Sequence, residues 1–248
     1  MLLQKPMNLI VDVGNTFVKF AVFEKNELLW KDAFELSAIR EAYKALRIKF
    51  PRLKSIIVSS VGKLGKQDIN YFKKDLKLLE LNSKTKVPFI NRYKTPETLG
   101  VDRIALVSAS VLKFPKVNAL IIDAGTCITY DFVTSKNEYL GGAISPGIRL
   151  RYKTLNNLTA NLPILDTEKP KDITGSSTEM SIHSGVINGI IKEIDGVIAE
   201  YQEKYPDLTV ILTGGDTKFL SNQLKNSIFA NSNFLLEGLN FILEFNSK

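Results

Sequence analysis

A motif that occurs twice carries most of the information in this sequence. Asn8–Thr16 reads Asn-Leu-Ile-Val-Asp-Val-Gly-Asn-Thr, and Ala119–Thr126 reads Ala-Leu-Ile-Ile-Asp-Ala-Gly-Thr. In each copy an apolar run of strand length ends in Asp-x-Gly, small polar residues follow, and a second strand-like run begins. This order predicts a β-hairpin whose turn presents backbone N–H groups and a hydroxyl to an anion. The aspartate at the strand end can hold a cation or orient a water, so two such hairpins facing each other would form a phosphate clamp.

Both halves of the chain begin with hairpin strands and end in helices. Apolar residues at helical spacing predict the main helices, which we expect at 97–113, 177–204 and 234–245. The first of them should end at Phe114-Pro115, because proline cannot continue a helix. We therefore expect an α/β protein with a sheet in each half, a crevice between the halves, and two domains, 1–115 and 116–248.

Composition narrows the class of protein. The chain has 248 residues, of which 44% are hydrophobic and 24% are charged, as is ordinary for a soluble globular enzyme. No apolar run approaches the roughly 20 residues that a membrane span needs, and the start lacks the pattern of a signal peptide, so we expect a cytoplasmic protein with no membrane contact. The single cysteine, Cys127, excludes an internal disulfide, and we expect it to be a small buried side chain. The single histidine, His183, leaves no room for a multi-histidine metal cluster.

The net charge of +7 is unevenly distributed. Residues 1–100 carry 19 Lys and Arg against 10 Asp and Glu, whereas the remainder carries 14 against 16. A basic surface of this kind can bind nucleic acid, but no interleaved aromatic residues or known binding module accompany it. We interpret it as a solvated, lysine-rich face and expect no nucleic-acid partner.

Four further segments have the residue types of a ligand site. Glycine pairs let a backbone approach a ligand closely, and the start of a helix has free N–H groups for an anion. The segments are Gly100-Val101-Asp102-Arg103 with Tyr93 upstream, Gly141–Gly147, Ser176–Glu179 and Gly214-Gly215-Asp216.

Taken together and in this order, the motifs resemble the type III pantothenate kinase family. The resemblance runs from about residue 8 to residue 240. It implies two duplicated ribonuclease-H-like domains of the acetate kinase/sugar kinase/Hsp70/actin superfamily, with a nucleotide-binding cleft between them. It also implies ATP-dependent phosphorylation of pantothenate to 4′-phosphopantothenate, the first step of coenzyme A biosynthesis. A homodimer, Mg²⁺ with the nucleotide and a monovalent cation, K⁺ or NH₄⁺, belong to the same expectation.

The family pattern implies a role for each matching residue. The first phosphate-binding hairpin would comprise Asp12, Val13, Gly14, Asn15, Thr16, Phe17, Val18 and Lys19. Thr126 in the second hairpin would also contact ATP, Gly214 and Gly215 would contact its adenosine, and Asp123 would hold the monovalent cation. The positions that would contact pantothenate are Tyr93, Gly100, Val101, Asp102, Arg103 and Thr178.

Elementary chemistry is compatible with these roles. Phosphoryl transfer needs the acceptor oxygen in line with the γ-phosphate and neutralisation of the developing charge. Asp102 would act as the catalytic base or simply hold the hydroxyl in line, and Arg103 offers a planar fork for a carboxylate or phosphate. Asp12 and Asp123 together would anchor hydrated Mg²⁺ and the monovalent ion against the triphosphate.

Two alternatives stay open at this point. The duplicated hairpins would also suit another small-molecule kinase or an exopolyphosphatase of the same superfamily. A non-catalytic nucleotide-binding regulator is the alternative from a different class of function. Three intact aspartates, Asp12, Asp102 and Asp123, argue against the regulator, which would not need all of them.

Overall fold

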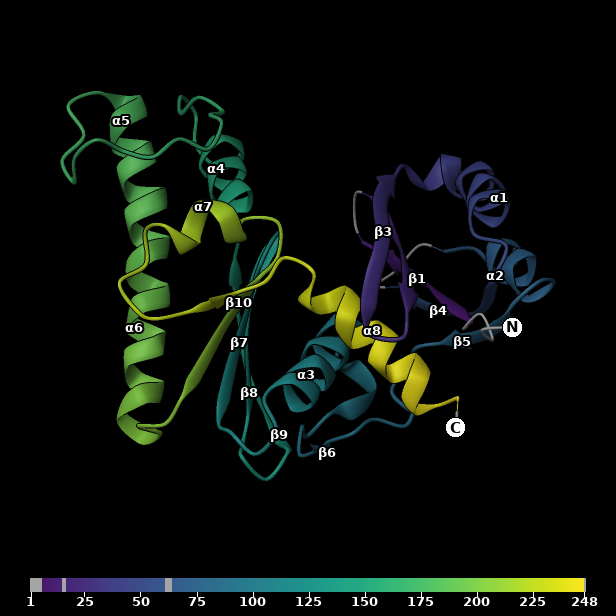
Figure 1. The fold of residues 1–248 in the computed structure, drawn as a ribbon. Coiled ribbons are helices and arrows are strands. Elements are labelled where there is room, and N and C mark those ends of the chain that lie inside the picture. The colour runs from purple at the N-terminus through teal and green to yellow at the C-terminus, as the bar shows by residue number, and fades with distance from the viewer. Residues whose placement is uncertain (1–5, 15–16, 61–63, 248) are drawn as a thin grey trace. The chain divides into compact units, whose positions relative to one another are not determined.

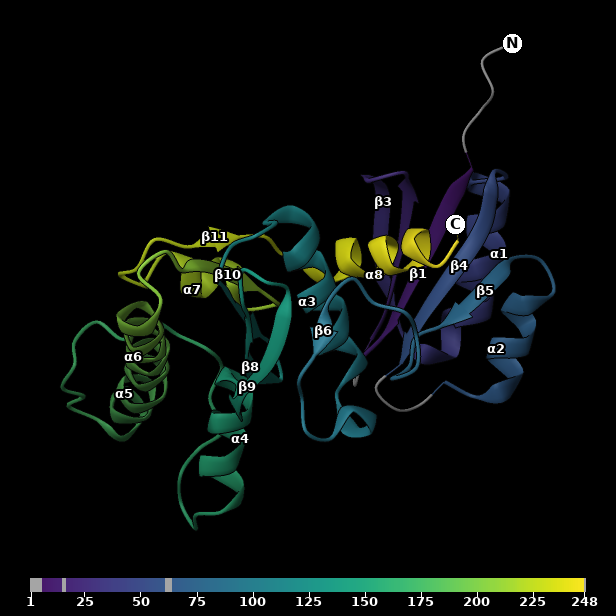
Figure 2. The same cartoon turned by 90° about the horizontal axis from the view of Figure 1, so that it is seen from below.

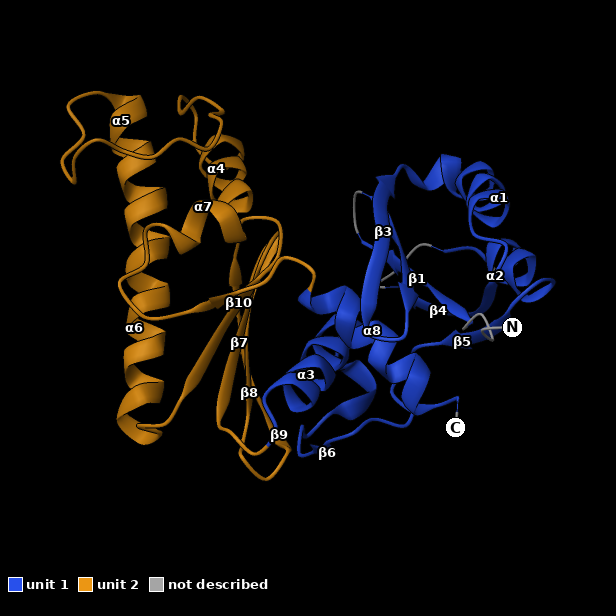
Figure 3. Ribbon diagram, viewed as in Figure 1, with its two compact units in different colours: residues 1–115, 234–248 blue, residues 116–233 orange. Residues whose placement is uncertain are grey.

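The computed structural model describes residues 6–14, 17–60 and 64–247, and the chain forms two compact units. Unit 1 comprises residues 1–115 and 234–248, and unit 2 comprises residues 116–233 (Figure 3). The predicted domains were 1–115 and 116–248, so the two divisions differ in where the C-terminal helix belongs. In the structure this helix packs within unit 1.

Unit 1 is built on a five-stranded mixed sheet (Figure 1). The first three strands form an antiparallel meander, and the last two run parallel to the first. In spatial order the strands are β3 (Glu27–Phe34), β2 (Val18–Glu24), β1 (Met7–Val13), β4 (Leu53–Ser60) and β5 (Lys77–Glu80).

Helices cover both faces of this sheet. Alternate residues of β1, among them Leu9 and Val11, belong to the same apolar core as Tyr43 of α1 (Ile39–Lys49) and Phe72 of α2 (Lys66–Lys73). On the other face Asn8 donates to Asn240 of α8 (Phe234–Phe245) at 2.9 Å, and α8 packs against α3 (Val101–Lys113), β1 and β4. Figure 2 shows α8 on the side of β1 and β4 opposite to α1 and α2. The elements of unit 1 outside its sheet are α1 (Ile39–Lys49), α2 (Lys66–Lys73), α3 (Val101–Lys113), α8 (Phe234–Phe245), the short strand β6 (Ile90–Asn91) and two single 3-10 turns, η1 (Leu36–Ala38) and η2 (Pro96–Thr98).

The position of α8 depends on contacts that are remote in sequence. Asn240 accepts the hydrogen bond from Asn8 and donates to the carbonyl oxygen of Lys25 at 2.7 Å. The ring of Phe234 packs, in a tilted orientation, against the ring of Phe114 at the end of α3, with the ring centroids 6.5 Å apart. A helix that buries its apolar face joins whichever layer offers a matching surface, and here that layer is the sheet of unit 1.

Unit 2 repeats the strand order of unit 1. A meander of three antiparallel strands is again followed by two strands parallel to its first strand. Within the unit the order is β9 (Glu138–Pro146), β8 (Cys127–Val133), β7 (Ala119–Ala124), β10 (Thr209–Thr213) and β11 (Phe229–Ala230). The sequence repeat is therefore a repeat of topology, with β1–β2 and β7–β8 as the equivalent hairpins.

The helices of unit 2 include one long column (Figure 1). Helix α5 (Thr178–His183) continues through a π-helical segment, η3 (Ser184–Asn188), into α6 (Gly189–Lys204). This column confirms the helix predicted over 177–204, apart from the π turn. Its apolar residues share a core with the strands, helix α4 (Ile148–Asn157) and the short helix α7 (Thr217–Ser221). Among the described residues, no helix combines the length and hydropathy that crossing a membrane requires.

Candidate functional site

The first hairpin places a buried aspartate opposite a lysine. Asp12, near the end of β1, is the register partner of Lys19 on β2, and Lys19 Nζ lies 3.9 Å from Asp12 Oδ2. The side chain of Asp12 is 10% exposed, whereas that of Lys19 is 53% exposed. The N–H of Gly14 donates to the carbonyl oxygen of Phe17 at 3.1 Å and closes the turn. Asn15 and Thr16 lie outside the described residues.

The sheet of unit 1 brings this aspartate close to a second one. Because side chains alternate along a strand, Asp12 points to the same face as Asn8, which is the face that α3 and α8 cover. Asp102 lies in the first turn of α3, where its Oδ1 accepts from the N–H of Arg103 at 2.8 Å. Burial raises the pKa of Asp12 to about 6; Lys19 opposes this shift and the charge of Asp102 adds to it. The pair of carboxylates creates a local excess of negative charge that a cation would stabilise.

Arg103 and Tyr93 form a second contact in unit 1. The guanidinium carbon of Arg103 lies 5.6 Å from the centroid of the Tyr93 ring, within the range of a cation–π interaction. Arg103 is buried, with 5% of its surface exposed, and Tyr93 is half-buried. Asp102 and Arg103 thus lie in the first turn of α3. The helix predicted at 97–113 begins at Val101, and the segment before it forms the separate 3-10 turn η2. Gly100, with extended backbone, is the N-cap position, and Val101 is half-buried.

In unit 2 the second hairpin lies against a glycine turn. Asp123 near the end of β7 pairs in register with Thr213 of β10, after which the chain turns through Gly214. Gly214 has a φ of +95°, and a Cβ there would lie 2.4 Å from Asp123 Oδ1 and 2.3 Å from the carbonyl oxygen of Ala124. Only glycine fits this position, because the backbone conformation and the space both exclude a side chain. The fold therefore joins Asp123 to Gly214, two residues that the sequence analysis singled out separately.

The turn of the second hairpin is exposed. The N–H of Gly125 donates to the carbonyl oxygen of Cys127 at 2.9 Å, and Thr126 is accessible to a ligand. The expectation that Cys127 is buried was wrong: it is exposed at the start of β8, and Ile128 points into the core instead. The alternation of the strand decides which of the two neighbours is buried.

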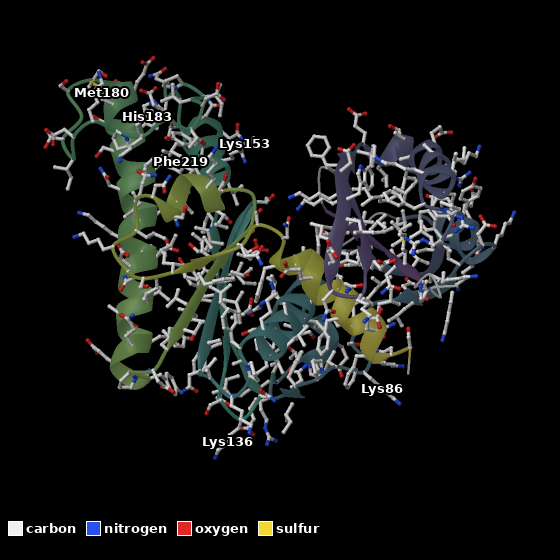
Figure 4. The ribbon with its side chains drawn as sticks, viewed as in Figure 1. Lys86, Lys136, Lys153, Met180, His183 and Phe219 are labelled. Carbon is white, nitrogen blue, oxygen red and sulfur yellow. The ribbon has the colours of Figure 1, made fainter. Side chains whose placement is uncertain are left out.

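A cavity of about 530 Å³ adjoins Gly215 and Asp216. Burial raises the pKa of Asp216, and Arg149, whose Nη1 lies 3.5 Å from Asp216 Oδ1, opposes the shift. Phe219, labelled on α7 in Figure 4, also lines the cavity. The full lining comprises Arg149, Thr167, Lys169, Gly215, Asp216, Lys218, Phe219, Asn222 and Gln223. The sequence analysis found only Gly215 and Asp216, because the other residues come from separate segments with no shared motif.

Thr178 lines a different and larger cavity of unit 2, of about 1020 Å³. It is the first residue of α5, after Ser177, whose Oγ accepts from the N–H of Met180 at 3.2 Å and caps the helix. The cavity is lined mostly by apolar atoms and reaches Pro146, the residue before Gly147. Gly147 in turn donates to the carbonyl oxygen of Thr126 at 3.0 Å. Through this segment the Thr178 cavity borders the second hairpin.

Comparison with known proteins places this geometry in a family. The family model described as type III pantothenate kinase matches residues 8–200. This chain belongs to the type III pantothenate kinase family. The type III pantothenate kinase of Christiangramia forsetii is 55% identical over 240 residues, which cover 97% of this chain and 99% of the relative. The match includes both hairpins and the Gly100–Arg103 motif.

Solved structures support the fold of a type III pantothenate kinase. A Campylobacter jejuni protein named as a Baf family transcriptional activator superposes with a TM-score of 0.67 at 22% identity, over 96% of this chain and 98% of that one. A glucokinase from an Antarctic psychrotroph superposes with a TM-score of 0.54 at 12% identity, over 98% and 100% of the two chains. At these identities the likeness concerns the fold alone. The mixed α/β sheets predicted from the sequence are confirmed.

Proposed function

We propose that this protein transfers the γ-phosphate of ATP to pantothenate, producing 4′-phosphopantothenate in the first step of coenzyme A biosynthesis. The observation that carries the proposal is the 55% identity to a type III pantothenate kinase across almost the whole of both chains. The carboxylates of Asp12 and Asp102, and the exposed residues Gly14 and Thr126 at the two hairpin turns, provide groups that phosphoryl transfer requires.

Asp102 acts on the acceptor hydroxyl of pantothenate. It lies at the start of α3, half-buried, beside the cationic Arg103. Its carboxylate accepts the hydroxyl proton or holds the oxygen in line with the γ-phosphate, and a loose transition state demands little from a base. Arg103, held over the Tyr93 ring, binds the carboxylate of pantothenate, and Thr178 contributes a hydroxyl to the same substrate.

The divalent ion that accompanies the nucleotide fits the buried carboxylate of Asp12. Magnesium is usually held by one or two carboxylates together with substrate phosphates, and Asp12 offers one such carboxylate. When bound, the ion neutralises charge on the phosphates. Asp12 provides the buried carboxylate for it, and Lys19 and the turn that begins at Gly14 bind phosphate oxygens. In unit 2 Asp123 holds the monovalent cation, K⁺ or NH₄⁺.

The nucleotide itself contacts unit 2 at two places. The exposed Thr126 turn binds phosphate, and the cavity at Gly215 receives the adenosine. Phe219 offers an apolar ring for the base, and Lys218 and Arg149 add positive charge at the edge of the cavity.

The protein acts as a homodimer in the cytoplasm, where ATP is available. The dimer is supported by Gly185 and Gly196, which are exposed on the long helical column and leave open space where a second copy can pack closely. Light scattering at micromolar concentration tests the dimer: a monomeric mass would exclude it. Fractionation of cells that produce the protein tests its location.

The decisive assay is ADP release from Mg-ATP, with and without pantothenate, in K⁺ and then in Na⁺ buffer. Turnover that needs both pantothenate and K⁺ or NH₄⁺ would support the substrate and the cation site at Asp123. Equal turnover in Na⁺ would keep the kinase and exclude the cation requirement. If ATP bound but pantothenate produced no turnover in any buffer, the acceptor would be another molecule or the protein would be a regulator.

A further inference from the structure

A half-buried ion pair in unit 2 connects strand β8 of the second hairpin with β9, α4 and α6. Glu193 of α6 accepts a hydrogen bond from Tyr130 Oη on β8 at 2.9 Å and forms an ion pair with Arg151 of α4. Burial opposes ionisation of Glu193, but hydrogen bonds from Arg151, Ser145 and Tyr130 lower its pKa below the usual value. The carboxylate is thus charged and has a donor on each of its oxygens.

Arg151 extends this network to the end of β9. Its Nε donates to the carbonyl oxygen of Pro146 at 2.9 Å, and its Nη2 donates to Ser145 Oγ at 3.0 Å. The planar guanidinium makes these bonds and the pair with Glu193 at the same time, which an ammonium group could not reproduce. Ser145 and Pro146 are consequently held at a defined position relative to α4 and α6.

Gly147, which follows Pro146, connects this segment to the proposed phosphate-binding turn. Gly147 donates its N–H to the carbonyl oxygen of Thr126 at 3.0 Å. A Cβ at Gly147 would lie 2.1 Å from the carbonyl oxygen of Gly125 and 2.6 Å from that of Thr126. The backbone at Gly147 therefore packs directly against the backbone of the Gly125–Thr126 turn, with no space between them for a side chain. Any displacement of Pro146 therefore moves the Gly125–Thr126 turn or breaks its contact with Gly147.

We propose that Glu193 and Arg151 are positioning residues that hold the Gly125–Thr126 turn in the conformation that binds the phosphates of ATP. Neither residue touches the nucleotide; both act through Ser145, Pro146 and Gly147. The proposal rests on the function proposed above, in which the Thr126 turn binds phosphate. Loss of the network should weaken the binding of ATP more than the binding of pantothenate.

Glu193→Gln is the most direct test, because the amide keeps the size of the side chain but removes its charge and leaves only one oxygen that can accept a hydrogen bond. Glu200→Gln is the matched control, since Glu200 lies on the same helix and is exposed. Wild type must first show pantothenate-dependent turnover, and its absence would refute the function itself before any variant is compared. We expect Glu193→Gln to raise the KM for ATP at least fivefold, with the KM for pantothenate within twofold of wild type.

Hydrogen exchange provides the readout on the turn. Peptides covering 124–128 and 145–149 should exchange faster in Glu193→Gln than in Glu200→Gln, whereas the strands of unit 1 should be unaffected.

Tyr130→Phe, which removes one hydroxyl and no charge, is the second variant if Glu193→Gln folds poorly. It should raise the KM for ATP and the exchange rate at the turn in the same direction, by a smaller factor. An unchanged KM for ATP in the folded variant would overturn the proposal, whether or not exchange at the turn became faster. An equal rise in both KM values would also overturn it.

Discussion

Replacing Asp12 with asparagine should stabilise the ligand-free protein while abolishing its activity. Asp12 is a carboxylate that folding buries close to a second carboxylate, Asp102, with only a partly exposed lysine as counter-ion. Its negative charge contributes to binding when a cation and phosphates are present, and it destabilises the folded state when they are absent. The variant keeps the shape of the side chain and removes the charge.

The shift in the pKa of Asp12 sets the size of the expected gain in the free energy of unfolding. Folding raises this pKa from 3.8 to about 6, which at about 1.4 kcal/mol for each unit amounts to about 3 kcal/mol. Because the folded state binds the proton more tightly than the unfolded state, Asp12 costs nothing below pH 3.8. Its contribution to the free energy of unfolding then falls as the pH rises to about 6 and is constant above that value. The wild type should thus lose up to about 3 kcal/mol across this window relative to Asp12→Asn.

Urea denaturation in the presence of a chelator measures this difference. We expect Asp12→Asn to be more stable than wild type by about 2–3 kcal/mol at about pH 7.5, with the gap closing towards about pH 4. Glu35→Gln, a substitution of an exposed acid in the same unit, is the control and should show no pH-dependent gap. A gap of the same size at both pH values, or a destabilised Asp12→Asn at about pH 7.5, would refute the reasoning.

Three further substitutions test the site and the packing. Asp102→Asn should lower pantothenate-dependent kcat by several orders of magnitude, and a loss of tenfold or less in a steady-state assay would reject its role as a base. Gly214→Ala should lower the free energy of unfolding, measured by urea denaturation, by about 2 kcal/mol or more, since the backbone has a φ of +95° and the new methyl group would collide with Ala124. If the variant were as stable as wild type, the turn would have to relax without strain. Asn240→Ala should lower the free energy of unfolding by about 1–3 kcal/mol, because the bonds to Asn8 and to the Lys25 carbonyl are lost, and an unchanged midpoint would show that α8 is held by apolar packing alone.

Local patterns in the sequence identified the elements on which the site is built. The strand–turn–strand order of the two Asp-x-Gly motifs is encoded within about 16 residues of each copy, so both hairpins were predictable. Helical periodicity also predicted the helices at 97–113 and 177–204; the first of them begins at Val101 in the structure, and the second contains a π turn. The family followed from the order of these local motifs.

Contacts between distant segments were out of reach of such patterns. Helix α8 looked like the end of the second domain, yet it packs in unit 1, because apolar periodicity specifies that a helix has a buried face without specifying the partner of that face. No sequence motif marks the cavity at Gly215 or the network of Glu193 and Arg151. Both are formed by residues from separate segments that come together only in the folded chain.

The sequence by itself determined the two hairpins, the residue types at their turns and the family. Only the tertiary structure decided that Asp12 is buried where the charge of Asp102 reaches it, that Asp123 lies against Gly214, and that Cys127 is exposed while Ile128 is buried. Hydrogen bonding and side-chain alternation within a short segment are properties of the local chain. Burial, and the pKa shifts that burial causes, depend on which surfaces finally pack against each other.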